Sequence, residues 1–314
     1  MFKTFVINSL SRSTAGSVRL FSGSASPTAA HGVKRLGVIG AGQMGLGIAL
    51  VAAKVAGVPV TIVDSSQASI NNSLEFMKRL LERDIAKQRL TGDVAEQIRA
   101  RISTSTDLSA LSEADFVIEA VPEIIALKLD IFSQLPSLTP PNAILATNTS
   151  SISITKIAAA AVGAEDRVLS THFMNPVPVQ KGVEIITGLQ TSPETLSRSL
   201  AFIKAMGKIP SKSKDTPGFL ANRILMPYIN EAIICLETGV GEKEDIDNIM
   251  KNGTNVPMGP LQLADFIGLD TCLSIMKVLY EDTSDSKYRP SVLLQKMVDA
   301  GWLGKKSGKG FYNY

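Results

Sequence analysis

Cysteine and excess charge are both scarce in this sequence of 314 residues. The two cysteines, Cys235 and Cys272, cannot form a disulfide framework, and no cluster of cysteines and histidines has the spacing of zinc ligands, so neither a small secreted domain nor a metal site is expected. With 32 basic and 29 acidic side chains the net charge is only +3, which argues against a nucleic-acid partner. Apolar runs long enough to span a membrane are also missing. The stretch over residues 36–63 contains several glycines, Lys54 and Pro59, and predicts no membrane span.

Acidic residues are absent from the start of the chain, where Asp64 is the first. Residues 1–30 hold seven serines and three basic residues, with apolar residues scattered between them. This composition, without a continuous apolar core, is typical of an organelle transit peptide rather than a secretory signal, and such peptides most often direct proteins to mitochondria. We therefore expect a leader over residues 1–31 and a location in the mitochondrial matrix. A merely disordered tail is the alternative.

Behind this segment the period of the apolar residues alternates between that of strands and that of helices. Short apolar runs predict strands at Leu36–Ile39, Val58–Val63, Phe116–Val121, Ile144–Ala146, Val168–Thr171 and Val183–Ile186. A three-to-four spacing predicts a helix over Ile70–Leu90. This alternation indicates an α/β domain of the Rossmann type, with a mostly parallel sheet, over residues 32–213.

Strand-like runs disappear beyond about Lys214. The apolar spacing there predicts helices over Leu220–Leu236, Glu242–Lys251, Leu261–Asp265, Thr271–Tyr280 and Ser291–Ala300. The turn residues Thr216-Pro217-Gly218 precede the first of them. We therefore expect an all-helical C-terminal domain over residues 214–314.

A glycine-rich loop, Gly40-Ala-Gly42-Gln-Met-Gly45, follows the first predicted strand and opens an alanine-rich helix. Gly40 permits a tight turn, Gly42 lets a pyrophosphate approach the backbone, and Gly45 allows the helix to pack closely on the strand. Asp64 ends the next strand, where its carboxylate can accept a hydrogen bond from a ribose 2′-hydroxyl and repel a 2′-phosphate. The sequence thus predicts a dinucleotide site that prefers NAD to NADP. A glycine-rich turn without a ligand is the alternative.

Polar residues also stand at the ends of the later strands. Asn148 and Ser150 follow one strand, His172 follows the next, and Glu184 lies in the strand after that. The only other histidine, His31, borders the leader. A neutral imidazole can take a hydroxyl proton near pH 7 while hydride leaves the same carbon, and a carboxylate would orient it. We predict that His172 is a general base paired with Glu184. A histidine with a structural role is the alternative.

Together these motifs resemble the L-3-hydroxyacyl-CoA dehydrogenases of fatty-acid β-oxidation, and the resemblance extends from about Val33 to Tyr314. The matching elements are Gly40–Gly45, Glu119–Glu123, Asn148–Ser151, His172–Pro178, Asp215–Phe219, Asn222-Arg223, Pro257–Pro260 and Gly304–Tyr312. The resemblance implies NAD-linked oxidation of an (S)-3-hydroxyacyl-CoA to the 3-oxoacyl-CoA. It also implies a homodimer joined through the helical domain.

The resemblance further implies roles for single residues. Ser150 and Asn222 would form hydrogen bonds around the reacting oxygen, and Asn175 would help to hold the base. Glu123 would lie beside the nicotinamide. Other contacts with NAD are expected from Gln43, Met44, Lys128, Asn148 and Ser150.

Two basic residues near the end of the predicted helix over Ile70–Leu90, Lys87 and Arg89, are candidates for holding the phosphates of coenzyme A. The alternative is that they form a solvated helix face, which is the usual place for charged residues.

Two other functions compete with this one. A related β-hydroxyacid or phosphogluconate dehydrogenase would use a lysine as base and would leave His172 and Glu184 idle. A crystallin-like protein that kept only the fold would have lost part of the catalytic set, whereas all of it is present here.

Overall fold

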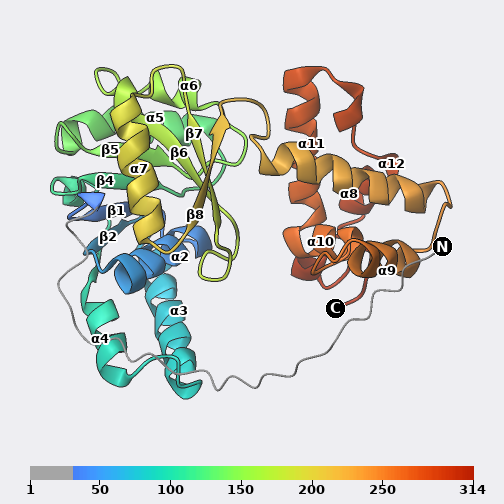
Figure 1. Cartoon of the computed structure of the whole chain (residues 1–314), viewed down its shortest axis with the longest axis horizontal. Coiled ribbons are helices and arrows are strands. Elements are labelled where there is room, and N and C mark those ends of the chain that lie inside the picture. The colour runs from blue at the N-terminus through green and yellow to red at the C-terminus, as the bar shows by residue number, and fades with distance from the viewer. Residues whose placement is uncertain (1–30) are drawn as a thin grey trace, which may run out of the picture.

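The computed structural model describes residues 31–314 (Figure 1). The predicted leader, residues 1–30, lies outside this range. His31, which the sequence analysis placed at the end of the leader, is buried, with its ring centroid 5.4 Å from that of Phe202. Residue 31 therefore already belongs to the packed chain. Within the described range, no helix is both long and apolar enough to cross a membrane.

An eight-stranded sheet forms the centre of the N-terminal part (Figure 1). Its strands are β1 (Leu36–Ile39), β2 (Val60–Val63), β3 (Ile102–Ser105), β4 (Phe116–Glu119), β5 (Ile144–Thr147), β6 (Val168–Phe173), β7 (Gly182–Thr187) and β8 (Ile209–Lys214). Their order in the sheet is β3-β2-β1-β4-β5-β6-β7-β8. Neighbouring strands are parallel except β6 and β7, so β7 and β8 run opposite to the others. The predicted α/β domain with a mostly parallel sheet is confirmed.

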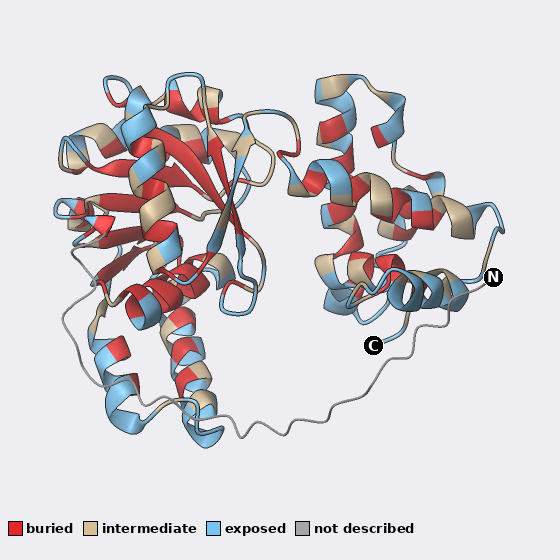
Figure 2. Cartoon of the chain, viewed as in Figure 1, coloured by how far each residue is buried: buried red, intermediate tan, exposed pale blue. Residues whose placement is uncertain are grey.

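Helices cover both faces of this sheet. They are α2 (Gln43–Val51), α3 (Gln67–Ala86), α4 (Gly92–Ala100), α5 (Ile125–Leu138), α6 (Ile154–Ala158) and α7 (Pro193–Ala205). In β4, Phe116 and Ile118 enter the core shared with α2, α3 and α7, whereas Val117 enters the core shared with α5 and α6. Figure 2 shows the inner strands of the sheet buried along most of their length. Because both faces are covered, these strands consist largely of apolar residues, which is why the sequence predicts them.

The apolar pattern misses two strands, β3 and β8, for a common reason. Both lie at an edge of the sheet and leave much of their length half-buried or exposed. An edge strand does not need a continuous apolar run, and these two are rich in serine, threonine and lysine.

The helix predicted over Ile70–Leu90 also ends earlier than expected. In the structure α3 ends at Ala86, and Gln88 takes a left-handed backbone with φ of +54°. A residue in this conformation cannot continue a right-handed helix. Lys87 and Arg89 therefore lie in a turn rather than on a helix face.

The C-terminal part is all-helical, as expected. Its helices are α8 (Ala221–Glu237), α9 (Lys243–Gly253), α10 (Pro260–Ile267), α11 (Leu269–Thr283) and α12 (Val292–Asp299). They share a core of their own, in which Ile229, Leu261 and Tyr288 are buried. The C-terminal segment closes this core because the buried Asp265 accepts the N–H of Phe311 at 3.0 Å.

Candidate active site

In the glycine-rich loop between β1 and α2, each glycine meets a different need. Gly40 has φ of +105°, and a Cβ on it would lie 2.7 Å from the carbonyl oxygen of Ala120. A Cβ on Gly45 would lie 1.9 Å from the carbonyl oxygen of Gly40, so only glycine lets the helix start this close to the strand. A Cβ on Gly42 would meet nothing within 4 Å. The backbone at Gly42 is therefore open to a pyrophosphate.

Asp64 lies beside this loop, just after β2, and is half-buried. Its Oδ2 accepts the N–H of Ala41 at 2.8 Å, and its Oδ1 accepts the N–H of Ser66 at 2.9 Å. A cavity of about 650 Å³, lined by Gly40, Asp64 and Pro122 among others, opens between the ends of the strands and α5. The loop, the carboxylate and the cavity fit the adenosine half of a dinucleotide. A contact of Asp64 with its ribose stays a prediction.

His172 and Glu184 are direct partners across the antiparallel strands β6 and β7. Nδ1 of the imidazole lies 2.8 Å from Oε2 of the carboxylate. Both side chains are buried, with 7% of His172 and 4% of Glu184 exposed. A carboxylate at Nδ1 holds the proton on that nitrogen, which leaves Nε2 free to accept another. The structure thus brings together the two residues predicted as base and partner.

The second oxygen of Glu184 is held by the helical part of the chain. Oε1 accepts the N–H groups of Leu220 and Ala221, at 2.8 and 2.9 Å, where α8 begins. Burial by itself would raise the pKa of Glu184, but the hydrogen bonds from His172 and from these two N–H groups outweigh it and hold the pKa below its ordinary value. Glu184 is therefore a stable anion beside the imidazole. The sequence analysis did not predict this contact between the two parts of the chain.

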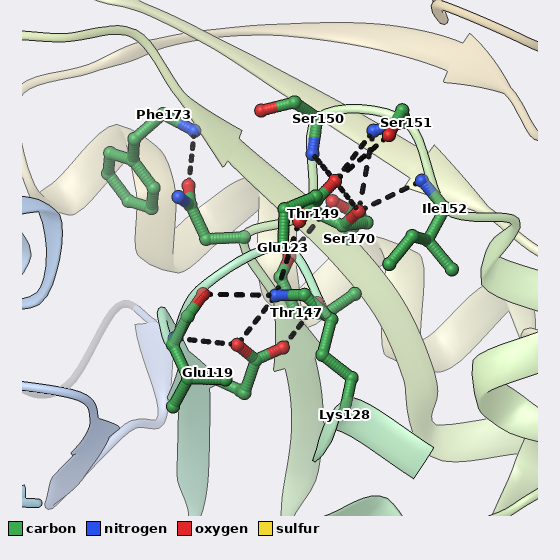
Figure 3. Close-up of polar contacts among 12 residues, drawn as sticks. Glu119, Glu123, Lys128, Thr147, Thr149, Ser150, Ser151, Ile152, Ser170 and Phe173 are labelled. Atoms are coloured by element: carbon green, nitrogen blue, oxygen red, sulfur yellow. Dashed lines mark hydrogen bonds and ion pairs between the residues drawn. The ribbon is translucent and has the colours of Figure 1, made fainter. Parts of the chain in front are cut away.

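Glu123 holds the turn that contains Ser150 (Figure 3). Its Oε1 accepts the hydroxyl of Thr149 at 2.5 Å, the N–H of Ser150 at 2.8 Å and the N–H of Ser151 at 3.0 Å. Burial acts to raise the pKa of Glu123, but the charge of Lys128 and these hydrogen bonds lower it below its ordinary value. Glu123 thus fixes the turn as an anion.

Two amide side chains tie this turn to its surroundings. Nδ2 of Asn222, from α8, donates to the carbonyl oxygen of Ser150 at 3.2 Å. Oδ1 of Asn148 accepts the N–H of Phe173, the residue after His172, at 2.8 Å. The structure thus joins Asn222 to Ser150, and Asn148 to the residue after His172. Their roles at the reacting oxygen and at NAD stay predictions.

Asn175 points to the glycine-rich loop instead. Its Oδ1 accepts a hydrogen bond from Nε2 of Gln43 at 3.3 Å, and within residues 31–314 no hydrogen bond joins Asn175 to His172. Met44, the neighbour of Gln43, is half-buried and packs against the core of the sheet. A cofactor contact by Gln43 or Met44 stays a prediction.

Lys128, predicted as a contact of the cofactor, is fully buried among acidic groups. Its Nζ lies 2.7 Å from Oε1 of Glu119 and 3.4 Å from Oε2 of Glu123. Glu119 is fully buried as well and was not among the predicted site residues. The signal for it was present, because an acidic residue that ends an apolar strand in the middle of a sheet must find a partner. A direct contact of Lys128 with NAD stays a prediction.

A second groove, of about 490 Å³, lies between α2, α3 and the segment after Asn175. Arg89 is among its lining residues, whereas Lys87 is exposed outside it. Oδ2 of Asp84 lies 3.0 Å from Nζ of Lys54, and its Oδ1 lies 3.8 Å from Nη1 of Arg89. The charges of the basic groups at this groove are therefore partly neutralised.

A Rossmann-type sheet that carries a dinucleotide loop at one strand end and a histidine–carboxylate pair at others is the arrangement of an NAD-dependent dehydrogenase. Comparison with known proteins narrows the class. Residues 35–216 match the family model described as the NAD binding domain of 3-hydroxyacyl-CoA dehydrogenase, and residues 218–314 match the one described as its C-terminal domain. The chain therefore belongs to the 3-hydroxyacyl-CoA dehydrogenase family and is an NAD-dependent oxidoreductase.

Individual relatives agree with this assignment. A protein of Bacillus subtilis named probable 3-hydroxybutyryl-CoA dehydrogenase is 51% identical over 282 residues, which cover 90% of this chain and 98% of that protein. The human hydroxyacyl-coenzyme A dehydrogenase, mitochondrial, is 42% identical over 90% of this chain and 91% of its own. The crystal structure of (S)-3-hydroxybutyryl-CoA dehydrogenase from Ralstonia eutropha superposes with a TM-score of 0.86 at 47% identity, covering 90% of this chain and 99% of that one.

Proposed function

We propose that this chain oxidises the 3-hydroxyl group of an (S)-3-hydroxyacyl-CoA to a ketone in fatty-acid β-oxidation, with His172 as the general base. The observation that carries the proposal is the buried pair of His172 and Glu184, whose Nδ1–Oε2 distance is 2.8 Å. Because Glu184 holds the proton on Nδ1, Nε2 of the imidazole is the atom that takes the hydroxyl proton. NAD held by the loop Gly40–Gly45 would supply the acceptor for the hydride that leaves C3, the carbon that carries the hydroxyl group.

In the proposed mechanism, Glu184 stabilises the imidazolium that forms when His172 takes the proton. A carboxylate bound to Nδ1 performs this task without being protonated itself. The two N–H groups from the start of α8 keep Glu184 ionised in its buried place. Ser150 and Asn222, which the structure joins through a hydrogen bond, would donate to the reacting oxygen as its charge develops.

For NAD, the proposed contacts are the loop Gly40–Gly45 for the pyrophosphate and Asp64 for the ribose. Their support is the open backbone at Gly42 and the adjoining cavity. Glu123, ionised at the Ser150 turn, is proposed to lie beside the nicotinamide.

The acyl-CoA is proposed to be short, and its CoA part to lie in the groove lined by Arg89. Short-chain specificity is supported by the Bacillus subtilis and Ralstonia eutropha relatives, which are named for 3-hydroxybutyryl-CoA. A series of 3-hydroxyacyl-CoAs of increasing length tests this, with the highest kcat/KM expected for the four-carbon substrate.

We further propose a mitochondrial homodimer, joined through helices of residues 214–314. The name of the human relative supports the location, and the composition of residues 1–30 supports a leader. An apolar groove of about 600 Å³ along α8, α9 and α10, beside the exposed Val240 and Ile249, supports the interface. A reporter protein fused behind residues 1–30 should enter mitochondria. Ile249→Asp, which places a charge in the apolar groove, should convert the dimer to a monomer, as measured by light scattering.

The base is tested by His172→Gln. Glutamine keeps much of the size but cannot take the proton, so turnover should fall by about 10² to 10⁴-fold with little change in NAD affinity. The matched control is His31→Gln, because His31 is also buried but packs against Phe202, and this variant should keep its turnover. The measurements are NADH formation from (S)-3-hydroxybutyryl-CoA and NAD binding by calorimetry. Unchanged turnover in His172→Gln would overturn the mechanism and favour a lysine base.

A further inference from the structure

Three charged side chains that the acid–base step does not use lie in a row beneath the Ser150 turn (Figure 3). Lys128 stands between Glu119 and Glu123, 2.7 Å from the first and 3.4 Å from the second. Glu119 and Lys128 are completely buried, while the side chain of Glu123 is 35% exposed. Burying a charge is unfavourable unless it is paired and hydrogen-bonded. The fold therefore has to hold these three groups in contact with one another.

The buried end of the row is anchored at the centre of the sheet. Glu119 ends β4, which lies between β1 and β5. Its Oε1 accepts the N–H of Val121 and its Oε2 accepts the hydroxyl of Thr147 on β5, each at 2.7 Å. With the bond from Lys128 both carboxylate oxygens are satisfied. Glu119 therefore gives Lys128 a fixed place.

The outer end of the row meets the substrate site. Glu123 uses Oε2 for Lys128, which leaves Oε1 for the hydroxyl of Thr149 and for the N–H groups of Ser150 and Ser151. These donors form one turn, and the carbonyl oxygen of Ser150 is held from the other side by Asn222. The direction of the Glu123 carboxylate thus decides how the turn is held.

We propose that Glu119 is a positioning residue for the dehydrogenase reaction: through Lys128 it sets the place and the ionisation of Glu123, and through Glu123 the geometry of the Thr149–Ser151 turn. The inference rests on the proposed role of Ser150 at the reacting oxygen. Lys128 is attracted to both carboxylates. The attraction to Glu119 therefore limits how closely Lys128 approaches Glu123.

Removal of either buried charge changes Glu123 in opposite ways. In Glu119→Gln, Lys128 keeps its charge and Glu123 becomes its only anion, which favours ionised Glu123 still more. In Lys128→Met, the carboxylates of Glu119 and Glu123 face each other without a cation, which favours protonated Glu123. A protonated Glu123 loses part of its hold on the N–H groups of the turn.

The experiment compares Glu119→Gln, Lys128→Met and the double variant by steady-state kinetics over a range of pH, with thermal unfolding of each. Glu119→Gln should lower kcat by about tenfold or more, because small displacements of positioned groups can cost up to about a hundredfold. Lys128→Met should raise the pH at which activity falls on the acid side, and the double variant should raise it less, because the loss of the Glu119 charge offsets part of the loss of the cation. Glu119→Gln alone should not raise it. The loss in the double variant should be smaller than the product of the single losses.

The matched control is Asp247→Asn in the helical part. Asp247 is also a buried carboxylate, and it accepts the N–H groups of Leu261 and Gln262 at the start of α10. This variant should unfold at a lower temperature and keep the kcat, KM and pH profile of the unchanged chain.

The inference is wrong if Glu119→Gln behaves like Asp247→Asn, with reduced stability and unchanged kinetics. It is also wrong if no variant that lacks Lys128 raises the pH at which activity falls on the acid side. If Lys128→Met does not fold, the double variant still tests the direction of the shift, because it lacks the cation that lies nearer to Glu123, and the expected shift is smaller. A failure of the proposed base is distinguishable, since it would appear as unchanged turnover in His172→Gln whatever Glu119→Gln does.

Discussion

Replacement of Glu184 by glutamine tests the link between the base and the helical part of the chain. Glutamine has one acceptor oxygen where Glu184 uses two, one for His172 and one for the N–H groups of Leu220 and Ala221. If the amide oxygen stays on the two N–H groups, the NH₂ group faces Nδ1 of His172. The imidazole must then carry its proton on Nε2, the atom that has to accept the substrate proton.

The two orientations of this glutamine predict different losses. The first keeps the hydrogen bonds to α8 and should change the free energy of unfolding by only about 1 kcal/mol, while the wrong tautomer lowers turnover by about 10² to 10⁴-fold. The second orientation places two N–H donors against an NH₂ group, and each lost bond to a charged acceptor costs about 1.5–3 kcal/mol. The first is therefore the expected one.

The assay follows NADH formation at saturating substrate, beside denaturant unfolding of the same preparation. Glu184→Gln should lose much more turnover than its loss of stability explains. Asp247 also accepts two N–H groups at the start of a helix but touches no histidine, so Asp247→Asn should lose stability alone. The double variant with His172→Gln should be little worse than His172→Gln, because the two residues act as one unit. Turnover within about twofold of the unchanged chain in Glu184→Gln would refute the tautomer argument.

Three further predictions follow from the cofactor loop, from Asp64, and from the carboxylates of Glu123 and Glu184. Asp64→Ala should weaken NAD binding by about tenfold or more and narrow the preference over NADP, measured as dissociation constants; an unchanged ratio would contradict the assignment. Gly42→Ala should fold normally but bind NAD poorly, whereas Gly45→Ala, whose Cβ would lie 1.9 Å from a carbonyl oxygen, should be destabilised by about 1–3 kcal/mol in denaturant unfolding. Because the pKa values of Glu123 and Glu184 are held below the ordinary 4.5, their contribution to stability should be complete above that pH and disappear as the pH falls through the lower folded values. Unfolding free energies that stay constant across this window would contradict that last prediction.

Much of the fold was predictable because the central strands are buried on both faces. Val38 and Ile118, for example, lie in buried strands whose residues are largely apolar. Ile102–Ser105 and Ile209–Lys214 are edge strands and carry no such constraint, so their residues give no strand signal. The end of α3 was missed for a different reason, since the apolar spacing continues to Leu90 although Gln88 has a left-handed backbone.

The site residues that lie near strand ends were predictable from the sequence. The contacts that hold them were not, where the partner is distant in the sequence. His172 and Glu184 lie at the ends of successive strands, so their approach follows from strand pairing. The N–H groups that hold Glu184 come from residues 36 and 37 positions later, and no local pattern marks them. Glu119 lies inside the predicted apolar run Phe116–Val121, and only the structure shows its partner, Lys128 on α5.

The contacts between the two parts of the chain make the base depend on where the helical part lies. The turn before α8 passes through left-handed backbone at Gly218 and at Phe219, with φ of +76° and +51°, and brings the ring of Phe219 to 6.0 Å from that of His172. From there α8 holds Glu184 through its first N–H groups and Ser150 through Asn222. One helix start therefore supports both sides of the reacting centre. In the proposed mechanism, any shift of α8 relative to the sheet would loosen His172 and the Ser150 turn together, so turnover would depend on the packing of residues that touch no substrate.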